Sequence, residues 1–499
     1  MTTGQEIRVD VVRSGHRLGA DPRRVLARPF RLGDDLAPDG RYRERVVIDR
    51  VLAMTEDEVH RSLSEVMTRF AHRHRNFESL LDQHFENVRG RLGDHLSQLP
   101  TSRRRLIGAY FTMEIAVEGA ALCNPSMVIT SVDESSGTAR FVMSVRAIGE
   151  GHISSIEFRS GTLDGEGKVF IDDPGEWLTA GKRVSDPLFE RISFRRKLLH
   201  LGADPESVSR VLEKLGDAFS LQSLDRATRT LYEGTVCNLA DRETIRIIHW
   251  LGGSNYDVRF AAETRMSERV LYPETAIESR GMEDARFVRF TDDDGSVYYY
   301  ATYTAYDGHH IMPQLIATDD FLSFRVRTLH GDAAHNKGMA LFPRRVNGKY
   351  AMIGRIDKQN MFFLESDEVH LWEQASVLRG PEFLWETVQI GNCGSPIETP
   401  EGWLLLTHGV GAMRRYTLGA ILLDLDDPRR VIGAIPYPIL EPNEQEREGY
   451  VPNVVYSCGG AAHAGYLHIP YGMSDGASGV ASFRIDQILD ELRRNPVRA

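Results

Sequence analysis

Apolar side chains recur every three or four residues between Val59 and Leu92, which is the spacing of one face of an α-helix. Just before this stretch, Thr55 stands three residues ahead of Glu58, the arrangement of a capping box at a helix start. The pattern predicts one long amphipathic helix or a pair of helices over residues 55–92. We expect its apolar face to pack on the rest of the chain or on a second copy, so a homo-oligomer through the N-terminal helices is one expectation.

A second helical pattern covers residues 204–224. It begins with Asp204 and Pro205, a favourable cap followed by a favourable first-turn residue. Apolar residues then follow at helical spacing through Leu215. A second helix is therefore expected in the N-terminal half.

From about residue 232 onward, short β-type runs alternate with Gly, Asp, Asn and Pro, which is typical of strands joined by turns. The runs fall into five units that recur roughly every 45–60 residues, the period of propeller blades. We expect a mainly β protein, a five-bladed β-propeller with an N-terminal α/β extension that contains long helices. The units cover residues 235–264, 284–321, 338–367, 394–425 and 451–485.

Residues 106–165 are also rich in β-type runs, and they echo the first unit. "LCNPSMV" followed by "ARFVMSVRAIGEGH" resembles "VCNLADR" followed by "NYDVRFAAET". Two arrangements stay open: an accessory sheet, or a sheet that itself enters the propeller. In the second arrangement Asn124, Arg146 and His152 become candidate site residues at the mouth of the channel.

The length of the chain indicates two structural parts. A single hydrophobic core stops growing at about 250–300 residues, and this chain has 499. We expect an N-terminal extension over residues 1–230 and a catalytic propeller over residues 231–490.

Charge and composition narrow the classes of partner. The net charge of −11 argues against nucleic acid, which is bound by basic surfaces. The sequence contains no apolar run of the ~18 residues that a membrane helix needs, and its first residues lack the apolar core of a signal peptide. We therefore expect a cytoplasmic protein with neither nucleic acid nor a membrane as its partner.

The four cysteines do not predict a metal site. Cys123, Cys237, Cys393 and Cys458 are far apart in the sequence and match no metal-ligand spacing. We expect buried free thiols, and no residue pattern points to a metal or an organic cofactor.

Candidate chemistry is concentrated in "SRGMEDARFV", residues 279–288. Asp284 stands at the start of a predicted strand, between Arg280 and Arg286, which is where a propeller places site residues. Taken alone, the adjacent acids Glu283 and Asp284 are explained more simply by a structural ion pair with the neighbouring arginines. Other predicted units also carry polar residues at comparable places: Asn238, Arg259, Lys337, Arg355, His408, Tyr416 and Asp475.

Several ordered motifs resemble glycoside hydrolase family 130, which contains β-mannoside phosphorylases and some β-mannosidases on a five-bladed propeller. The motifs are "GMEDARF", "YTAYDG", "LFPRRVNGKYAMIGR", "GWLLLTHGV" with "YTLGAILLDLDDP", and "VPNVVY" with "YGMSD". The resemblance covers about residues 232–485. It implies inverting cleavage of a β-mannosidic bond, with inorganic phosphate as co-substrate if the enzyme is a phosphorylase.

The resemblance also implies roles for single residues. Asp284 matches the general acid, and Glu283 and Arg286 are expected to orient it. Asn238 and Asp475 match residues that bind sugar hydroxyls. The residues that match the phosphate and adjoining sugar subsite are Arg259, Lys337, Arg355, His408 and Tyr416.

Two departures from the family pattern bear on the reaction. Ala285 replaces a proline, and Gln389 stands where many phosphorylases have a phosphate-binding lysine. Phosphorolysis of a β-mannoside to α-mannose 1-phosphate is the leading expectation. The alternatives are a β-mannosidase that uses water, with a base among Glu382, Glu386 and Glu398, and a non-catalytic carbohydrate-binding propeller.

Overall fold

The computed structural model describes residues 9–33, 36–92, 96, 98–184, 188–232 and 238–497. The chain forms two compact units. The larger unit comprises Met1–Ala20, Ala120–Pro174 and Gly181–Ala499, and the smaller unit comprises Asp21–Gly119 and Gly175–Ala180. This division does not coincide with the boundary expected near residue 230, because residues 120–174 and 181–230 belong to the same unit as the C-terminal half.

The smaller unit is a helical cluster with one β-hairpin. Its elements are α1 (Arg43–Leu52), α2 (Glu56–Phe70), α3 (Phe77–Leu92), α4 (Thr101–Tyr110), β3 (Val25–Pro29) and β4 (Thr112–Ala116). The stretch 55–92 is thus a helix pair, one of the two arrangements expected. The predicted capping box is confirmed, since the Glu58 amide donates to the Thr55 hydroxyl and the Thr55 amide donates to the Glu58 carboxylate.

The larger unit is mainly β, and its long strands form five antiparallel groups. The first two belong to one sheet and are joined by a single parallel pair, Gly281 with Ser154. Group one contains β5 (Ala121–Asp133), β6 (Thr138–Ile148), β7 (Ser154–Leu163), β8 (Val169–Ile171) and β14 (Arg269–Leu271). Group two contains β15 (Gly281–Thr291), β16 (Val297–Tyr306), β17 (Ile311–Thr318), β18 (Ser323–Thr328), β13 (Tyr256–Arg259) and β10 (Lys182–Arg183).

The other three groups follow in chain order. Group three contains β19 (Lys337–Leu341), β20 (Tyr350–Arg355), β21 (Met361–Ser366) and β22 (Ala375–Arg379). Group four contains β23 (Gln389–Asn392), β24 (Ile397–Thr399), β25 (Gly402–Val410), β26 (Tyr416–Leu423) and β27 (Val431–Ala434). Group five contains β28 (Val455–Tyr456), β29 (Ala461–His463), β30 (Tyr466–Met473), β31 (Ala477–Arg484), β1 (Val12–Arg13) and β2 (Leu18–Gly19).

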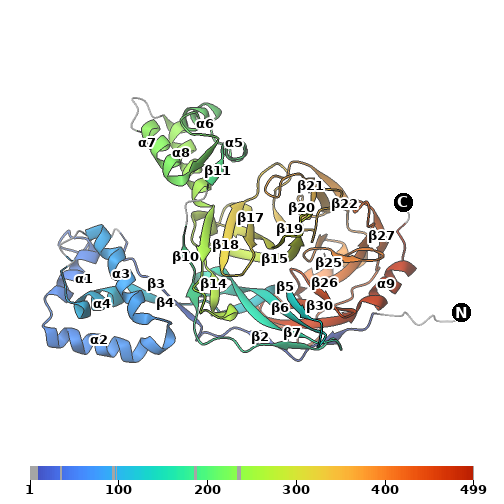
Figure 1. Cartoon of the computed structure of the whole chain (residues 1–499), viewed down its shortest axis with the longest axis horizontal. Coiled ribbons are helices and arrows are strands. Elements are labelled where there is room, and N and C mark those ends of the chain that lie inside the picture. Colours follow the sequence, from blue (N-terminus) through green and yellow to red (C-terminus); the bar gives the residue numbers. More distant parts are fainter. Residues whose placement is uncertain are drawn as a thin grey trace. The chain divides into compact units, whose positions relative to one another are not determined.

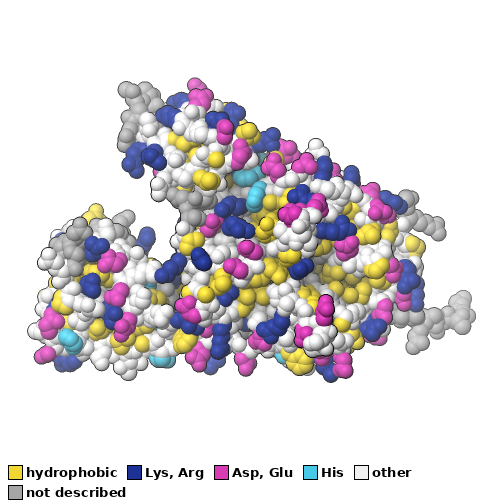
Figure 2. Space-filling view, in the orientation of Figure 1, with side chains coloured by type: hydrophobic (Ala, Val, Ile, Leu, Met, Phe, Trp, Pro, Cys, Tyr) yellow, Lys and Arg dark blue, Asp and Glu magenta, His cyan; other side chains and the backbone are white. Residues whose placement is uncertain are grey.

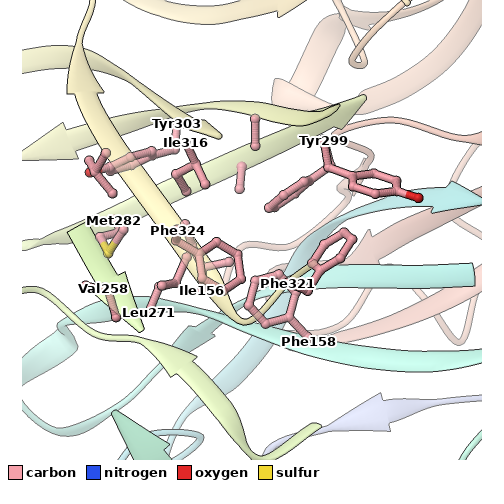
Figure 3. Close-up of a cluster of buried hydrophobic side chains, with 14 of the residues drawn as sticks. Ile156, Phe158, Val258, Leu271, Met282, Tyr299, Tyr303, Ile316, Phe321 and Phe324 are labelled. Atoms are coloured by element: carbon pink, nitrogen blue, oxygen red, sulfur yellow. The ribbon is translucent and has the colours of Figure 1, made fainter. Parts of the chain in front are cut away.

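Successive groups pack on one another through shared hydrophobic cores. Figure 3 shows the core between groups one and two, where the Phe158 ring lies 5.7 Å from that of Phe324 and 6.0 Å from that of Phe321. Similar cores join groups two and three, three and four, and four and five. Group five is hydrogen-bonded to group one, because the Cys458 amide donates to the Pro125 carbonyl at 2.8 Å.

A helical segment is inserted between β10 and β13, and it is drawn in green in Figure 1. Its elements are β11 (Leu188–Glu190), α5 (Arg191–His200), α6 (Pro205–Leu212), β12 (Ala218–Ser220), α7 (Leu221–Tyr232) and α8 (Leu239–Gly253). The predicted cap at Asp204 is confirmed, because its carboxylate accepts from the Ser207 amide at 2.8 Å.

The first predicted β unit, residues 235–264, is wrong in the part that the structure describes. Residues 239–253 form α8, and only β13 is a strand. Ile245, Ile248 and Leu251 lie three residues apart, and the last two are buried among the neighbouring helices. The β-branched run therefore forms a helix face, and residues 121–163 provide the first group of strands instead. Cys237 lies outside the described residues, whereas Cys123, Cys393 and Cys458 are buried free thiols.

Candidate active site

The first long strands of groups one to three are each interrupted by a bulge. The interruptions lie between Cys123 and Ser126, between Glu283 and Arg286, and between Lys337 and Ala340. Each contains a residue in the left-handed region, respectively Asn124 (φ 48°), Asp284 (φ 56°) and Gly338 (φ 87°). Since a bulge removes a residue from the ladder and redirects its side chain, Asn124 and Asp284 are turned out of their strands.

The Asp284 carboxylate is held by two side chains of group one. Asn124 Nδ2 donates to Asp284 Oδ1 at 2.7 Å, and an Arg146 guanidinium nitrogen lies 3.2 Å from the same oxygen. Another Arg146 nitrogen contacts Glu283 Oε1 at 2.8 Å. One arginine on β6 thus binds both acids of the Glu-Asp pair on β15.

Glu283 connects this arrangement to group three. Lys337 Nζ lies 2.6 Å from Glu283 Oε2, while Arg146 occupies the other carboxylate oxygen. Glu283 is 8% exposed, so both of its oxygens are committed to cations in a sheltered place. This residue fixes Lys337 and Arg146 relative to Asp284.

Arg286 links the same strand to group five. Its guanidinium donates to the Tyr456 hydroxyl at 2.7 Å and lies 3.8 Å from the Cys458 sulfur. It is 3% exposed and forms no ion pair with a carboxylate of the described residues. A buried guanidinium without such a partner retains donors for a ligand.

Arg355 and His408 bring groups three and four into the site. An Arg355 nitrogen lies 3.2 Å from His408 Nε2, so Nε2 accepts and the imidazole is neutral. Burial, followed by the charges of Arg355 and Arg286, holds the pKa of His408 well below its usual value. Tyr416 stacks on the His408 ring at 6.2 Å, and the Tyr456 ring lies 4.9 Å from it.

Several buried polar atoms around this cluster have no partner among the described residues. They include Arg355 Nε, Asn392 Oδ1, Asn124 Oδ1 and Arg146 Nε. A methyl group on Gly338 would lie 3.8 Å from Arg286, Arg355 and Asn392 at once, so these three side chains surround one spot. Because buried polar groups are normally paired, this arrangement indicates a place for a polar ligand.

Asp284 and Asp475 respond differently to their surroundings. Burial alone would raise the pKa of Asp284, but the charges of Arg146 and Arg286, the Asn124 hydrogen bond and the Lys337 charge lower it overall. Burial, followed by the negative charge of Asp284, raises the pKa of Asp475. Asp475 lies in the turn between β30 and β31 with φ 50°. The structure thus gathers one ionised and one less acidic carboxyl beside three arginines and a lysine.

Comparison with known proteins identifies the family. Residues 246–494 match a family model described as beta-1,4-mannooligosaccharide phosphorylase, glycoside hydrolase family 130. A 1,2-beta-oligomannan phosphorylase of Thermoanaerobacter sp. (strain X514) is 36% identical over 231 residues, which are 45% of this chain and 75% of the relative. The chain belongs to glycoside hydrolase family 130. It is an enzyme of that family of β-mannoside phosphorylases.

A second relative and a solved structure are also similar to this chain. A beta-1,2-mannobiose phosphorylase of Listeria innocua serovar 6a is 31% identical over 231 residues, covering 44% of this chain and 63% of the relative. The solved structure of a beta-1,2-mannobiose phosphorylase from Listeria innocua in complex with beta-1,2-mannobiose has a TM-score of 0.46 and 21% identity, covering 76% of this chain and 94% of that one. The family model begins at residue 246, after the strands that carry Asn124 and Arg146.

Asn238 and Arg259, two of the residues that the sequence assigned to the family 130 site, do not join the cluster. Asn238 caps α8, since its side chain accepts from the Asp241 amide at 2.8 Å. Arg259 is exposed on β13, opposite Lys182 and Ser323. Asn124 and Arg146 occupy the corresponding places, because residues 121–163 form the first strand group.

The remaining candidates are placed as follows. Asp284, Glu283, Arg286, Lys337, Arg355, His408 and Tyr416 are joined by the contacts described above, and Asp475 interacts electrostatically with Asp284. His152 is exposed in the turn after β6, with its ring 6.1 Å from that of Tyr450. Gln389 lies on β23 opposite Val410, and Ala285 is buried in β15.

The sequence did not single out Tyr456 or Asn392. Tyr456 ends the motif "VPNVVY", and its hydroxyl binds Arg286. Asn392 ends β23 and points one unpaired oxygen toward the spot beside Gly338. The motif containing Tyr456 was recognised in the sequence, but nothing in its local pattern predicts that the Tyr456 side chain contacts Arg286 of β15.

The described residues contain no group of three or more His, Cys, Asp or Glu side chains arranged to hold a metal ion. Among the helices of the described ranges, none has the length and apolar character to cross a bilayer.

Proposed function

We propose that the five strand groups are the blades of a five-bladed β-propeller, formed by residues 121–163 and the strands from β13 to β31 and closed by β1 and β2. The shared cores between successive groups and the hydrogen bonds from group five to group one support this arrangement. The bulged first strands then meet around a common axis, which explains how residues from all five groups contribute to one cluster.

We propose further that this site cleaves a β-mannosidic bond with phosphate and releases α-mannose 1-phosphate. The observation that carries this proposal is the spot beside Gly338, where Arg286 and Arg355 have no carboxylate partner in the described part of the chain. The charges of both guanidinium groups act on His408. Guanidinium groups that share such surroundings are stabilised by an anion, and their donor geometry suits phosphate oxygens.

The reaction balances with one protein acid. A phosphate oxygen attacks the anomeric carbon from the face opposite the leaving sugar, so the bond from that carbon to the glycosidic oxygen breaks as the new carbon–oxygen bond forms. Asp284 donates a proton to the departing oxygen and regains one from the monohydrogen phosphate. The attack inverts the configuration from β to α.

The charge around Asp284 gives phosphate a second role. In the ligand-free protein the arginines lower the pKa of Asp284, so the carboxyl is ionised at neutral pH. An anion bound beside Arg286 offsets part of that positive charge and favours the protonated form. Phosphate binding therefore prepares the acid as well as supplying the nucleophile.

The hydrolytic alternative needs a carboxylate that activates water. Glu386 is buried in an ion pair with Arg379 at 2.8 Å, Glu382 lies 3.4 Å from the same arginine, and Glu398 binds Arg344 at 2.7 Å. All three candidate bases are thus engaged with arginines that do not contact Asp284. This placement favours phosphate over water.

Incubation with β-1,2- and β-1,4-mannobiose, with and without phosphate, tests the reaction. We expect mannose 1-phosphate of α configuration, detected by phosphorus and proton NMR, only when phosphate is present. Asp284→Asn should lower kcat by about 10²–10⁴-fold, the range for loss of a general acid, whereas the exposed control Asp319→Asn should not change it. Cleavage at equal rates without phosphate would replace phosphorolysis by hydrolysis.

A further inference from the structure

A second pocket lies between the inserted helical segment and strand groups two and three. Its volume is ≈ 510 Å³, within the range of small-molecule sites. The walls come from the end of α5, from Trp250 of α8, from the turn between β16 and β17, from the segment before β19, and from the turn after β20. The inserted helices therefore build one side of a pocket whose other side belongs to the strand groups.

The pocket is lined by an excess of basic side chains. Figure 2 shows histidines beside lysine or arginine side chains where the helical segment meets the sheets. Two acids offset part of this charge: Asp332 lies 3.5 Å from His200, and Asp307 lies 3.0 Å from His310. The basic lining residues are Lys197, His200, His309, His310, His335 and Lys358.

Lys197 is the most informative of these residues. It is only 4% exposed and lines the pocket. Among the described residues its ammonium group has no hydrogen bond or ion pair, only a longer-range attraction to Asp332. Burial lowers its pKa to about 8. A buried ammonium without a paired anion is costly, so the pocket is better satisfied when an anionic group is bound.

The pocket adjoins the catalytic cluster. Pro313 and Asn336 line it, and the same two residues line a small cavity that Asp284 and Arg286 also border. Asn336 is followed directly by Lys337, which binds Glu283. A sugar whose glycosidic oxygen is protonated by Asp284 can therefore extend toward this pocket on its leaving-group side.

We propose that this pocket is an acceptor subsite for an anionic sugar, with Lys197 and Lys358 binding a phosphate monoester or carboxylate carried by the leaving group. The Trp250 ring, 5.7 Å from the ring of His310, supplies an aromatic face on which a sugar ring can pack. This subsite rests on the proposed phosphorolysis. It gives the inserted helical segment a function, namely the selection of the acceptor.

The synthetic direction of the reaction tests the subsite. With α-mannose 1-phosphate as donor, the acceptors are mannose, mannose 6-phosphate and mannuronate, which share a ring and differ in charge. We expect at least tenfold higher kcat/KM for one of the charged acceptors than for mannose. Preference for mannose 6-phosphate would indicate a phosphate site, and preference for mannuronate would indicate a carboxylate site. Equal values for all three acceptors would overturn the proposal.

Variants connect that preference to the pocket. Lys197→Met and the exposed Lys358→Gln should each lower the ratio of kcat/KM for the charged acceptor to that for mannose by roughly tenfold, the effect of one lost charge-assisted hydrogen bond. The control Lys349→Gln, a partly exposed residue just before β20 and outside the pocket, should leave the ratio unchanged. A ratio that neither pocket variant alters would contradict the assignment.

Calorimetry separates failure of the subsite from failure of the proposed function. If none of these acceptors is used, the mannobiose experiment above decides phosphorolysis, and titration of mannose 6-phosphate and mannuronate into the full chain decides the pocket alone. If one of the two compounds binds, and binds more weakly to the Lys358→Gln variant, the pocket is an anion site whether or not the enzyme catalyses phosphorolysis. Absence of binding to the unaltered protein would exclude the site as well.

Discussion

Asp284 is a carboxyl group on which burial and charge act in opposite directions. Burial favours its protonated form, whereas Arg146, Arg286, Asn124 and Lys337 favour the ionised form and prevail. A general acid must be protonated before it acts. If Asp284 is the general acid proposed above, it therefore becomes competent only when an anion reduces the positive charge around it.

Replacing Arg146 by Gln should raise the pKa of Asp284, because Arg146 is the largest of the charges that lower it. Activity of a general acid falls as pH rises through its pKa, so the alkaline limb of the kcat/KM profile should move to higher pH in this variant. The pH dependence of phosphorolysis provides the measurement. The exposed Arg140→Gln, which lies on the same strand and pairs with Asp172, is the matched control and should keep the original profile.

Much of the site was predictable from residue motifs. Asp284, Glu283 and Arg286 share one motif, and Lys337, Arg355 and His408 stand at strand positions that the motifs mark. Asn124 was harder to separate from Asn238, because each asparagine follows a cysteine and precedes a segment with an arginine. The spacing of Asn238 and Asp241 is the deciding local signal, since it forms a helix cap.

At the scale of single elements, the strands after residue 281 follow the sequence pattern closely, while the inserted helices do not. The run from Thr244 to Leu251 contains several β-branched residues, which favour strands when judged locally. Its period is nevertheless helical, and the neighbouring helices α5, α6 and α7 bury one of its faces. Tertiary packing therefore overrides local propensity in this segment.

Loss of the capping box at α2 should destabilise the smaller unit. Thr55→Ala removes the hydroxyl that accepts from the Glu58 amide, and replacement of such caps costs about 1 kcal/mol. Urea unfolding followed by circular dichroism should show that loss in the transition of the helical unit. Thr68→Ala, in an exposed position of the same helix where the hydroxyl bonds only the Ser64 carbonyl, should leave stability nearly unchanged.

The short strands β1 and β2 complete group five. Both pair with β31, Val12 opposite Ser482 and Leu18 opposite Ser478. Deletion of residues 1–19 exposes the edge of β31, and exposed edges promote association between chains. We expect a lower melting temperature and aggregation in light scattering, and a shortened chain that behaves as the full chain does would contradict this role of β1 and β2.

At the scale of the whole molecule, neutral histidines that are buried or half-buried make the fold sensitive to acid. Burial lowers the pKa of His330 to about 3 and those of His370 and His468 to about 4. Their stabilising contribution is complete above the unfolded value near 6.5 and is lost as pH falls, because the unfolded chain then binds more protons. Burial raises the pKa of Glu278. Its contribution to stability is therefore lost as pH rises, opposite to that of the histidines.

Stability should therefore fall between pH 6.5 and pH 5.5. Each of the three histidines contributes about 1 kcal/mol of this loss, roughly 3 kcal/mol together, in a window above the range where ordinary carboxyl groups titrate. Calorimetric melting at several pH values provides the measurement. His468→Gln should reduce the slope of stability against pH, and a melting temperature independent of pH in this range would show that these histidines are not neutral in the folded protein.

The pairing of β1 and β2 with β31 also affects how the enzyme is made. Residues 12–19 leave the ribosome long before their partner strand at 477–484 is synthesised. The surroundings of Asp284 are likewise incomplete until Tyr456 and Asp475 have been synthesised. A nascent chain therefore carries Asp284, the proposed general acid, before the residues that complete its surroundings have been made, and the site forms only after Asp475 has emerged.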